Sequence, residues 1–421
     1  MKEEKVFKDP VHKYIYVQDK VIWDLINTKE FQRLRRIRQL GTSYLTFHGA
    51  EHSRFSHSLG VYEITRKIIS LFERHNYSDW PRDERLLCLC AALLHDIGHG
   101  PFSHSIEKAF RMNHEDWTCR IVLGDSEVNR VLYHADPTFP QKVADIICKK
   151  YSNELVVSLI SSQLDADRMD YLLRDAYFTG VNYGTFDLER ILRMIRPHQG
   201  HLVIKESGMH AVEDYLMSRY QMYWQVYFHP VTRSGEILLD KIFQRAKALY
   251  QQGYSFGFLL PPLEKLFIAN MTTEDYFQLD ESLMQTVFMQ WSSESDRILA
   301  DLCSRFLHRK LFRYTAVESD ADPRLTNLKN WMNQNGWDAE AYLEIDFPLD
   351  MPYDIYRPGE MDEKLPILLL DDQKQLNEIS TISEIVRSIS GIRKGKPQLY
   401  YPAELAQEPS LPGEVRSLLF P

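Results

Sequence analysis

The chain has 421 residues, which is more than one small hydrophobic core holds, so two or three packed units are expected. Its content of 44% hydrophobic and 26% charged residues is ordinary for a globular protein. The net charge of −9 argues against a surface that coats nucleic acid, and a polyanionic substrate would need a local cluster of basic side chains.

The first predicted elements are a short extended segment and a basic helix. Residues 6–17 are expected to be extended, with a turn at Asp9-Pro10. Apolar residues then recur every three positions from Phe31 to Leu40 among four arginines, which predicts an amphipathic helix with a basic outer face. We interpret this face as solvated, with an anion or nucleotide site as the alternative.

Helical periodicity dominates most of the chain. Helices are predicted over residues 57–75, 82–96, 104–110, 117–123, 153–160, 167–178, 186–195, 209–227 and 232–251. Strands are expected at 311–317, 341–347, 366–370 and 398–401, with helices at 324–333 and 381–388 between them. This change near residue 310 predicts a mainly α domain over 1–310 and a smaller α+β part over 311–421, which would serve assembly or regulation.

The compartment is indicated by what the sequence lacks. The N-terminus has no apolar stretch of the signal-peptide kind, and the longest apolar run, residues 86–94, is far shorter than the roughly 20 residues that span a bilayer. The cysteines are odd in number and form no CxxC motif, so we expect reduced core thiols. We therefore expect a cytoplasmic protein without a membrane or nucleic-acid partner.

The most informative segment is residues 93–104. An apolar helix ends at His95-Asp96, and Gly98 and Gly100 are expected to turn the chain sharply with positive φ angles. Adjacent imidazole and carboxylate groups can point at one ion, and Mn, Fe, Ni, Zn and Mg are all compatible with them. Further imidazoles follow on the same turn, at His99 and His104.

Other ligands are needed because two adjacent groups cannot complete a metal site. His57 begins a strongly apolar helix, and Asp167 lies among several carboxylates at the start of another. A single histidine is more often structural than a ligand, and a single HD dipeptide is a weak signal. The order His57, His95-Asp96, Asp167 on apolar helices is stronger, and it predicts one divalent ion per subunit.

These residues resemble the H…HD…D signature of the HD superfamily. The wider pattern is similar to the HD-domain deoxynucleoside triphosphate triphosphohydrolases, both the bacterial members and the vertebrate SAM- and HD-domain enzyme. The motifs that carry the resemblance are residues 8–12, 31–35, 39–41, 54–60, 95–104, 114–115, 167–175 and 219–229. The resemblance is dense from about residue 5 to 250 and fades in the last hundred residues. It implies a helical HD-domain fold with its core at about residues 50–180.

The resemblance also implies a reaction. Enzymes of that family hydrolyse a dNTP between the 5′ oxygen and the α-phosphate, releasing a deoxynucleoside and intact triphosphate. Its residues map here to the four metal ligands His57, His95, Asp96 and Asp167. The implied catalytic and phosphate-binding residues are His114 as acid or base, oriented by Glu115, with His99, His104, Arg54 and Arg219 around the phosphates.

The substrate residues implied on the nucleoside side are Gln39, Tyr171 and Asp175. Gln39 would face the sugar 3′-hydroxyl, and Tyr171 under the deoxyribose would leave little room for a 2′-hydroxyl. An ordinary core role for Tyr171 is equally compatible with the sequence. Arg168 and Tyr223 stand where the vertebrate pattern has lysine and histidine, so Arg168 keeps the charge in a different, planar form.

An activating nucleotide and a homo-oligomer, a dimer or tetramer, are further implications. The activator residues would be Lys5, Val6 and Arg35, with Asn27 where the vertebrate enzyme has an aspartate that reads guanine. An amide cannot accept two guanine donors as a carboxylate does, so guanine preference is not implied. An arginine-rich helix that forms only salt bridges is the alternative.

Other functions stay open. The alternatives are an HD phosphohydrolase that acts on a nucleoside monophosphate, a cyclic dinucleotide or (p)ppGpp, and a nucleotide-sensing protein without catalysis. The match at Gln39, Arg54, Tyr171 and Arg219 favours dNTP hydrolysis, because a bare HD site does not require these residues.

Overall fold

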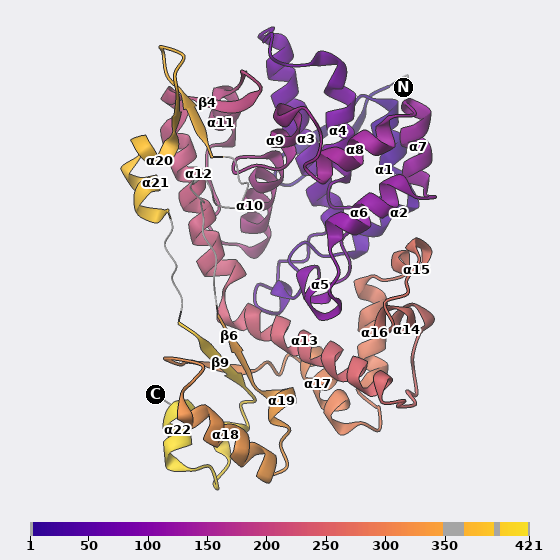
Figure 1. Ribbon diagram of the computed structural model, residues 1–421, viewed down its shortest axis with the longest axis vertical. Coiled ribbons are helices and arrows are strands. Elements are labelled where there is room, and N and C mark those ends of the chain that lie inside the picture. Colours follow the sequence, from indigo (N-terminus) through magenta and orange to yellow (C-terminus); the bar gives the residue numbers. More distant parts are fainter. Residues whose placement is uncertain (1–2, 348–365, 391–395, 420–421) are drawn as a thin grey trace.

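The structure is a computed structural model that describes residues 3–347, 366–390 and 396–419. Helices dominate these residues, and three small sheets accompany them. The helices surround two hydrophobic cores, and α13 (Pro230–Gln251), which packs in the second, crosses the molecule between its upper and lower parts (Figure 1).

The N-terminal segment is extended, as predicted. Strands β1 (Lys5–Asp9) and β2 (Lys13–Val17) form an antiparallel hairpin. The Asp9 carboxylate holds its turn by accepting the backbone N–H groups of Val11 and His12, both at 2.9 Å. Helix α1 (Lys20–Ile26) follows.

The prediction of a helix over residues 31–40 is wrong in extent. Helix α2 (Lys29–Arg33) continues only as the short 3-10 helix η1 (Leu34–Arg36). The chain then leaves the helix because the backbone of Ile37 and Gln39 bonds with that of Arg54 and His52. Arg33 is not on a solvated face: it is buried and donates to the carbonyl oxygens of His99 and Leu279.

The first core lies among helices that carry the HD motif. Helix α3 (Arg54–Arg74) packs against α4 (Arg85–Leu94) and α10 (Ala166–Thr179). The surrounding elements are α5 (His104–Phe110), α6 (His114–Leu123), α7 (Glu127–Ala135), α8 (Phe139–Ile147), α9 (Glu154–Ile160), α11 (Leu188–Met194), α12 (Met209–Met222), η5 (Tyr223–Tyr227) and the hairpin β3 (Ile195–His198) and β4 (His201–Lys205). Most of the predicted helices of this region are present within a few residues of their expected ends.

The second core is built by α13 and the elements that follow it. These are α14 (Pro261–Phe267), α15 (Thr273–Phe277), α16 (Glu281–Trp291), α17 (Arg297–Leu307), α18 (Pro323–Gln334), α19 (Ala339–Tyr342), α22 (Gly413–Leu419) and the sheet of β5 (Arg313–Ala316), β9 (Gln398–Tyr401) and β6 (Glu344–Asp346). Ile106 and Phe110 of α5 and Trp117 of α6 also pack in this core. Helix α6 therefore joins the two cores, because its Ile121 and Val122 pack in the first.

The two cores cross the expected boundary at residue 310. Strand β7 (Leu368–Leu370) pairs in parallel with β4, and β8 (Leu376–Glu378) extends the same sheet. Helices α20 (Ile379–Ile382) and α21 (Glu384–Ile389) pack in the first core, beside α12 in the upper left of Figure 1. Strand β9 and α22 then return to the second core.

The described residues hold no helix with the length and apolarity that a bilayer crossing requires. All five cysteines are free, and Cys88, Cys90 and Cys303 are buried, whereas Cys119 and Cys148 are partly exposed.

Candidate active site

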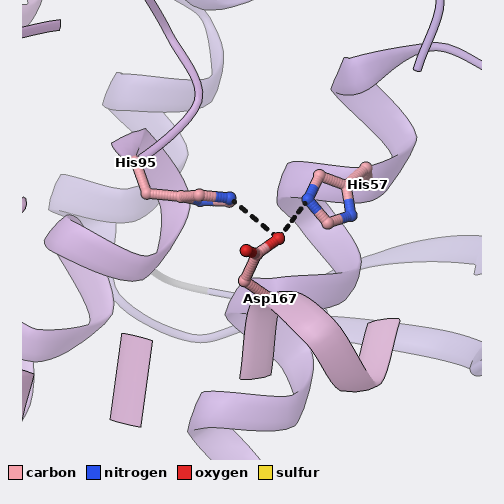
Figure 2. A group of neighbouring side chains, drawn as sticks. All are labelled: His57, His95 and Asp167. Carbon is pink, nitrogen blue, oxygen red and sulfur yellow. Dashed lines mark hydrogen bonds and ion pairs between the residues drawn. The ribbon is translucent and has the colours of Figure 1, made fainter. Parts of the chain in front are cut away.

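Three of the predicted metal ligands converge from three helical elements. His57 lies in the first turns of α3, His95 caps α4, and Asp167 begins α10. Both imidazoles point at one Asp167 oxygen, with 3.0 Å from His57 Nε2 and 3.6 Å from His95 Nε2 to Oδ1 (Figure 2). Ligand atoms of the three residues lie within 4.8 Å of one another, close enough to hold one ion.

Asp96 lies against the same cluster. Its carboxylate oxygens are 3.4 Å from His95 Nε2 and 3.7 Å from His57 Nε2, and it also pairs with the Arg54 guanidinium. The structure thus brings all four predicted ligands together.

The donor atoms fit a metal ion. His95 Nδ1 lies 2.9 Å from the Ala92 carbonyl oxygen, so it carries the proton, and Nε2 is buried with no hydrogen-bond partner. His57 Nδ1 lies 2.8 Å from the Asp170 carboxylate, which likewise leaves Nε2 toward the cluster. Two imidazole nitrogens beside two carboxylates are a ligand set for a divalent metal, although they do not identify which one.

The carboxylates of the cluster stabilise positive charge on the groups beside them. Burial opposes a charged His57 ring, but the carboxylates of Asp167 and Asp170 outweigh it and raise the pKa of His57 to about 10. The pKa of Asp96 is held well below its usual range, because the Arg54 guanidinium and nearby imidazoles outweigh its burial. A bound cation would take the place of the protons held in this cluster.

The acid/base candidate His114 is held by a carboxylate that the sequence analysis missed. Its Nδ1 lies 3.1 Å from Glu107 Oε1, and its ring stacks on His99 with centroids 3.8 Å apart. Glu115, which was expected to orient His114, forms an exposed ion pair with Lys149 at 3.3 Å, and its orienting role stays a prediction. The signal for Glu107 was its position three residues after His104, one helical turn along α5.

His99 is an uncharged donor or acceptor in this site. Its burial and the neighbouring Arg54 lower the pKa of His99 to about 4. Its Nε2 lies 3.3 Å from Asp96 Oδ1, and its Nδ1 lies 3.3 Å from Glu107 Oε1. His99 therefore connects the histidine–aspartate cluster with the acid/base candidate His114.

The turn after His95-Asp96 is not made by positive φ angles at Gly98 and Gly100. Positive φ occurs instead at Phe102 (57°) and Ser103 (47°). Gly98 is needed for close approach, because a Cβ there would overlap the carbonyl oxygen of His114 and the backbone nitrogen of Thr118. This contact brings α6, and with it His114, against the turn.

A cavity of about 610 Å³ opens beside the cluster. Its lining includes nine predicted site residues: Gln39, Arg54, Asp96, His99, His114, Asp167, Tyr171, Asp175 and Tyr223. Asp175 is held from both sides, since its oxygens lie 2.7 Å from His52 Nε2 and 2.7 Å from the Tyr227 hydroxyl. His52 was not predicted from the sequence.

Two predicted phosphate ligands are not part of this lining. Arg168 forms an ion pair with Asp165, and Arg219 donates to Gln163 Oε1 at 2.8 Å. Both carry a buried Nε without a hydrogen-bond partner. The side chain of His104 lies outside the described residues.

The predicted activator residues lie in two groups. Val6 and Lys5 are exposed on β1, and the Lys5 amine lies 6.0 Å from the centre of the Trp23 ring. The backbone carbonyl oxygen of Trp23 accepts a hydrogen bond from Asn27 Nδ2 at 2.7 Å. Arg35 is on η1, with its guanidinium 3.6 Å from the centre of the Phe55 ring.

Comparison with known proteins gives consistent matches. The HD domain model matches residues 54–175, and the HD associated region model matches residues 186–253. The chain is 57% identical over 427 residues to YwfO of Bacillus subtilis, covering 100% of this chain and 98% of that protein. It is 31% identical over 415 residues to MJ1154 of Methanocaldococcus jannaschii, covering 96% and 80% of the two chains.

Two further matches carry names that describe an activity. The zebrafish deoxynucleoside triphosphate triphosphohydrolase SAMHD1 is 26% identical over 376 residues, covering 78% of this chain and 59% of that protein. The crystal structure of a phosphohydrolase from Bacteroides thetaiotaomicron matches with a TM-score of 0.83 and 27% identity, covering 95% of this chain and 100% of that one.

The helical fold and the cluster of two histidines with two aspartates define the HD class of proteins. Within that class, this chain belongs to the HD-domain phosphohydrolase family. Both the expected family and the expected mainly α fold are confirmed.

Proposed function

We propose that the chain hydrolyses deoxynucleoside triphosphates to a deoxynucleoside and intact triphosphate. The observation that carries this proposal is one cavity whose lining combines Asp96 and Asp167 of the cluster, Arg54 and His114 with Gln39, Tyr171 and Asp175. Its volume of about 610 Å³ is in the range of small-ligand sites. The match to a deoxynucleoside triphosphate triphosphohydrolase supports the same substrate class.

The reaction breaks the bond between the α-phosphorus and the 5′ oxygen. The oxygen of water adds to phosphorus, and a proton must reach the departing 5′ oxygen to form the hydroxyl group. His57, His95, Asp96 and Asp167 would hold a divalent ion, which would supply the Lewis acidity for attack by water on the α-phosphate.

The remaining residues of the phosphate side act directly. His114, restrained by Glu107, is the proposed proton donor. Neutral His99 offers a hydrogen bond to a phosphate oxygen without repelling Arg54. Arg54, fixed by Asp96 and by Ser103 Oγ at 2.7 Å, supplies the positive charge that stabilises the transition state.

The nucleoside side is proposed to read the sugar. Gln39 Oε1 is buried without a hydrogen-bond partner, which makes it available to a sugar hydroxyl. Asp175 lines the same cavity with its carboxylate fixed by two neighbours. Tyr171 is proposed to pack under the deoxyribose and exclude a 2′-hydroxyl.

A substrate screen tests the proposal. Purified protein is incubated with each of the four dNTPs and four rNTPs, in Mn²⁺ and in Mg²⁺, and products are separated by ion-exchange chromatography. We expect equimolar deoxynucleoside and triphosphate from dNTPs and little product from rNTPs. Release of phosphate or pyrophosphate, or hydrolysis only of nucleoside monophosphates, cyclic dinucleotides or (p)ppGpp, would assign a different HD phosphohydrolase reaction. No hydrolysis of any of them would favour a nucleotide sensor.

Activation by a second nucleotide is proposed at Lys5, Val6, Asn27 and Arg35, with an oligomer of two or four copies as the active form. In this arrangement Arg35 would act through the segment that leads from η1 to Gln39. The C-terminal residues would serve assembly or regulation. The cytoplasm stays the proposed location.

A further inference from the structure

A buried polar network lies on the Nδ1 side of His57. Its members are Asp170 and Arg174 of α10, and Asp9 and His12 at the turn of the β1–β2 hairpin. Asp170 and Arg174 have no exposed surface, and Asp9 and His12 are also buried. Their hydrogen bonds connect the hairpin with the metal cluster without a gap.

We propose that the β1–β2 turn positions the metal ligand His57. His12 and Asp9 fix Asp170 and Arg174, and Asp170 in turn fixes the His57 ring with Nε2 toward the metal. The inference rests on the metal centre of the proposed function, and it assigns positioning roles to four residues outside the cavity lining.

The Asp170 carboxylate has no freedom to rotate, because both oxygens are engaged. Oδ2 lies 2.8 Å from His57 Nδ1 and 2.8 Å from Arg174 Nε. Oδ1 lies 2.6 Å from His12 Nε2 and 2.9 Å from Arg174 Nη2. An ionised carboxylate only accepts hydrogen bonds, so His57 must keep its proton on Nδ1 and offer Nε2 as the ligand atom.

The hairpin closes the network from its far side. Asp9 Oδ1 accepts the backbone N–H of His12 and fixes the turn, while Asp9 Oδ2 accepts from Arg174 Nη1 at 2.8 Å. The turn therefore supplies one carboxylate for Arg174 and one imidazole for Asp170. Losing either partner would leave a buried charge with fewer hydrogen bonds, which is costly.

Gly60 of α3 shows how closely the elements must approach. A Cβ at this position would overlap the Asp170 carboxylate and lie 2.5 Å from Arg174 Nη2. Only glycine leaves room for the two side chains to pass α3 and meet the hairpin.

Mn²⁺ affinity, measured by competition with a chelating dye, and thermal unfolding of the metal-free protein test the inference together. His12→Leu removes the donor to Asp170, and we expect about tenfold weaker Mn²⁺ binding. His12→Gln retains a donor and should restore most of the affinity. The matched control is Tyr62→Phe, which removes another bond between α3 and the hairpin, the 2.9 Å bond from the Tyr62 hydroxyl to the Tyr16 carbonyl oxygen. It should lower the unfolding temperature but leave Mn²⁺ affinity unchanged.

The inference is overturned if His12→Leu binds Mn²⁺ as tightly as the wild type, or if Tyr62→Phe weakens binding equally. If His12→Leu does not fold, Asp9→Asn gives the second measurement, because it keeps an acceptor for the turn and weakens only the Arg174 contact. Its Mn²⁺ affinity should fall in the same direction, and unchanged affinity would contradict the inference. A wild-type protein that binds no divalent metal would overturn the metal centre of the proposed function itself.

Discussion

His114 and His99 stack on one another and share the Glu107 carboxylate. A carboxylate at 3.1 Å from Nδ1 restrains the imidazole ring and favours the tautomer in which Nδ1 carries a proton. Glu115 instead forms an exposed ion pair with Lys149, and such a surface pair restrains its side chains weakly.

Glu107→Gln is therefore expected to lower kcat by about 10- to 100-fold while the metal content stays unchanged. The same replacement at Glu115 should have little effect, because a surface ion pair contributes at most about 1 kcal/mol. Steady-state kinetics of both variants on one dNTP decide between them. A larger loss in Glu115→Gln would return the orienting role to Glu115.

The raised pKa of His57 predicts how metal binding depends on pH. The folded metal-free chain holds this proton up to a pKa of about 10, compared with 6.5 for an ordinary histidine. Its contribution to stability is therefore complete below pH 6.5 and lost as the pH rises through 10. A metal ion must displace the Nε2 proton, so apparent metal affinity should rise between about pH 6 and pH 9. Titration calorimetry in buffers of different protonation enthalpy would show proton release, whereas an affinity independent of pH would contradict the assignment.

The convergence of four residues could be predicted from sequence because the order His57, His95-Asp96, Asp167 is a recognisable pattern. Their partners could not. His57 and Asp170 are 113 positions apart in sequence, and the fold alone brings their side chains within 2.8 Å. Glu107 was overlooked because Glu115 is adjacent to His114 in sequence, but adjacent residues on a helix point in different directions.

Among the elements, the turn that follows His95-Asp96 packs closely against α6 at Gly98. Gly98→Ala would place a Cβ against the backbone of His114 and Thr118, and backbone cannot move aside as a flexible side chain does. We expect a loss of about 1–3 kcal/mol of stability and reduced turnover as His114 is displaced. The control is Gly413→Ala, where a Cβ meets no atom within 4 Å. Equal melting temperatures and activities for the two variants would show that the approach is not needed.

Element prediction succeeded where periodicity was strong and failed where tertiary contacts decide. The ends of α18 and β9 were predicted to within one residue, and the buried residues of α18 recur at helical spacing. The helix expected at 31–40 stops early, because the backbone of Ile37 and Gln39 is hydrogen-bonded to residues 52–54. Arg33 is buried because it donates to carbonyl oxygens such as that of His99. The β3–β4 hairpin was missed, because no element was predicted between the helices at 186–195 and 209–227.

At the scale of the whole molecule, the site lies where the two cores meet. The ligand-bearing helices α3, α4 and α10 pack in the first core, whereas α5 and the Trp117 side of α6 pack in the second. Trp117 stacks on Tyr276 at 4.0 Å, and the Tyr276 hydroxyl donates to the Gly98 carbonyl oxygen at 2.6 Å. The change from helical to mixed α and β patterns near residue 310 did not indicate this position of the site, because β7 and α21 follow residue 310 but pack in the first core.

Arg35 on η1 is close in sequence to Gln39, which lines the cavity, so nucleotide binding at Arg35 would influence the cavity through Gln39. We expect one dNTP to stimulate hydrolysis of another, and Arg35→Ala to reduce this stimulation more than the basal rate. Mixed-nucleotide kinetics, with light scattering to follow oligomer size, measure both. Arg130→Ala, at a surface arginine paired with Asp125, is the control. If each dNTP alone is hydrolysed at its full rate and a second nucleotide does not change that rate, activation by a second nucleotide is excluded.

We propose that His57, His95, Asp96 and Asp167 hold a metal on which hydrolysis depends. Asp167→Asn and Asp165→Asn make the same change two residues apart, but Asp165 is the N-cap of α10 and its carboxylate accepts the backbone N–H groups of Ser162 and Arg168, both at 2.7 Å. Elemental analysis of the purified proteins should find one divalent ion per chain in the wild type and Asp165→Asn, and a large deficit in Asp167→Asn. Full metal content in Asp167→Asn, with hydrolysis unchanged, would contradict the account.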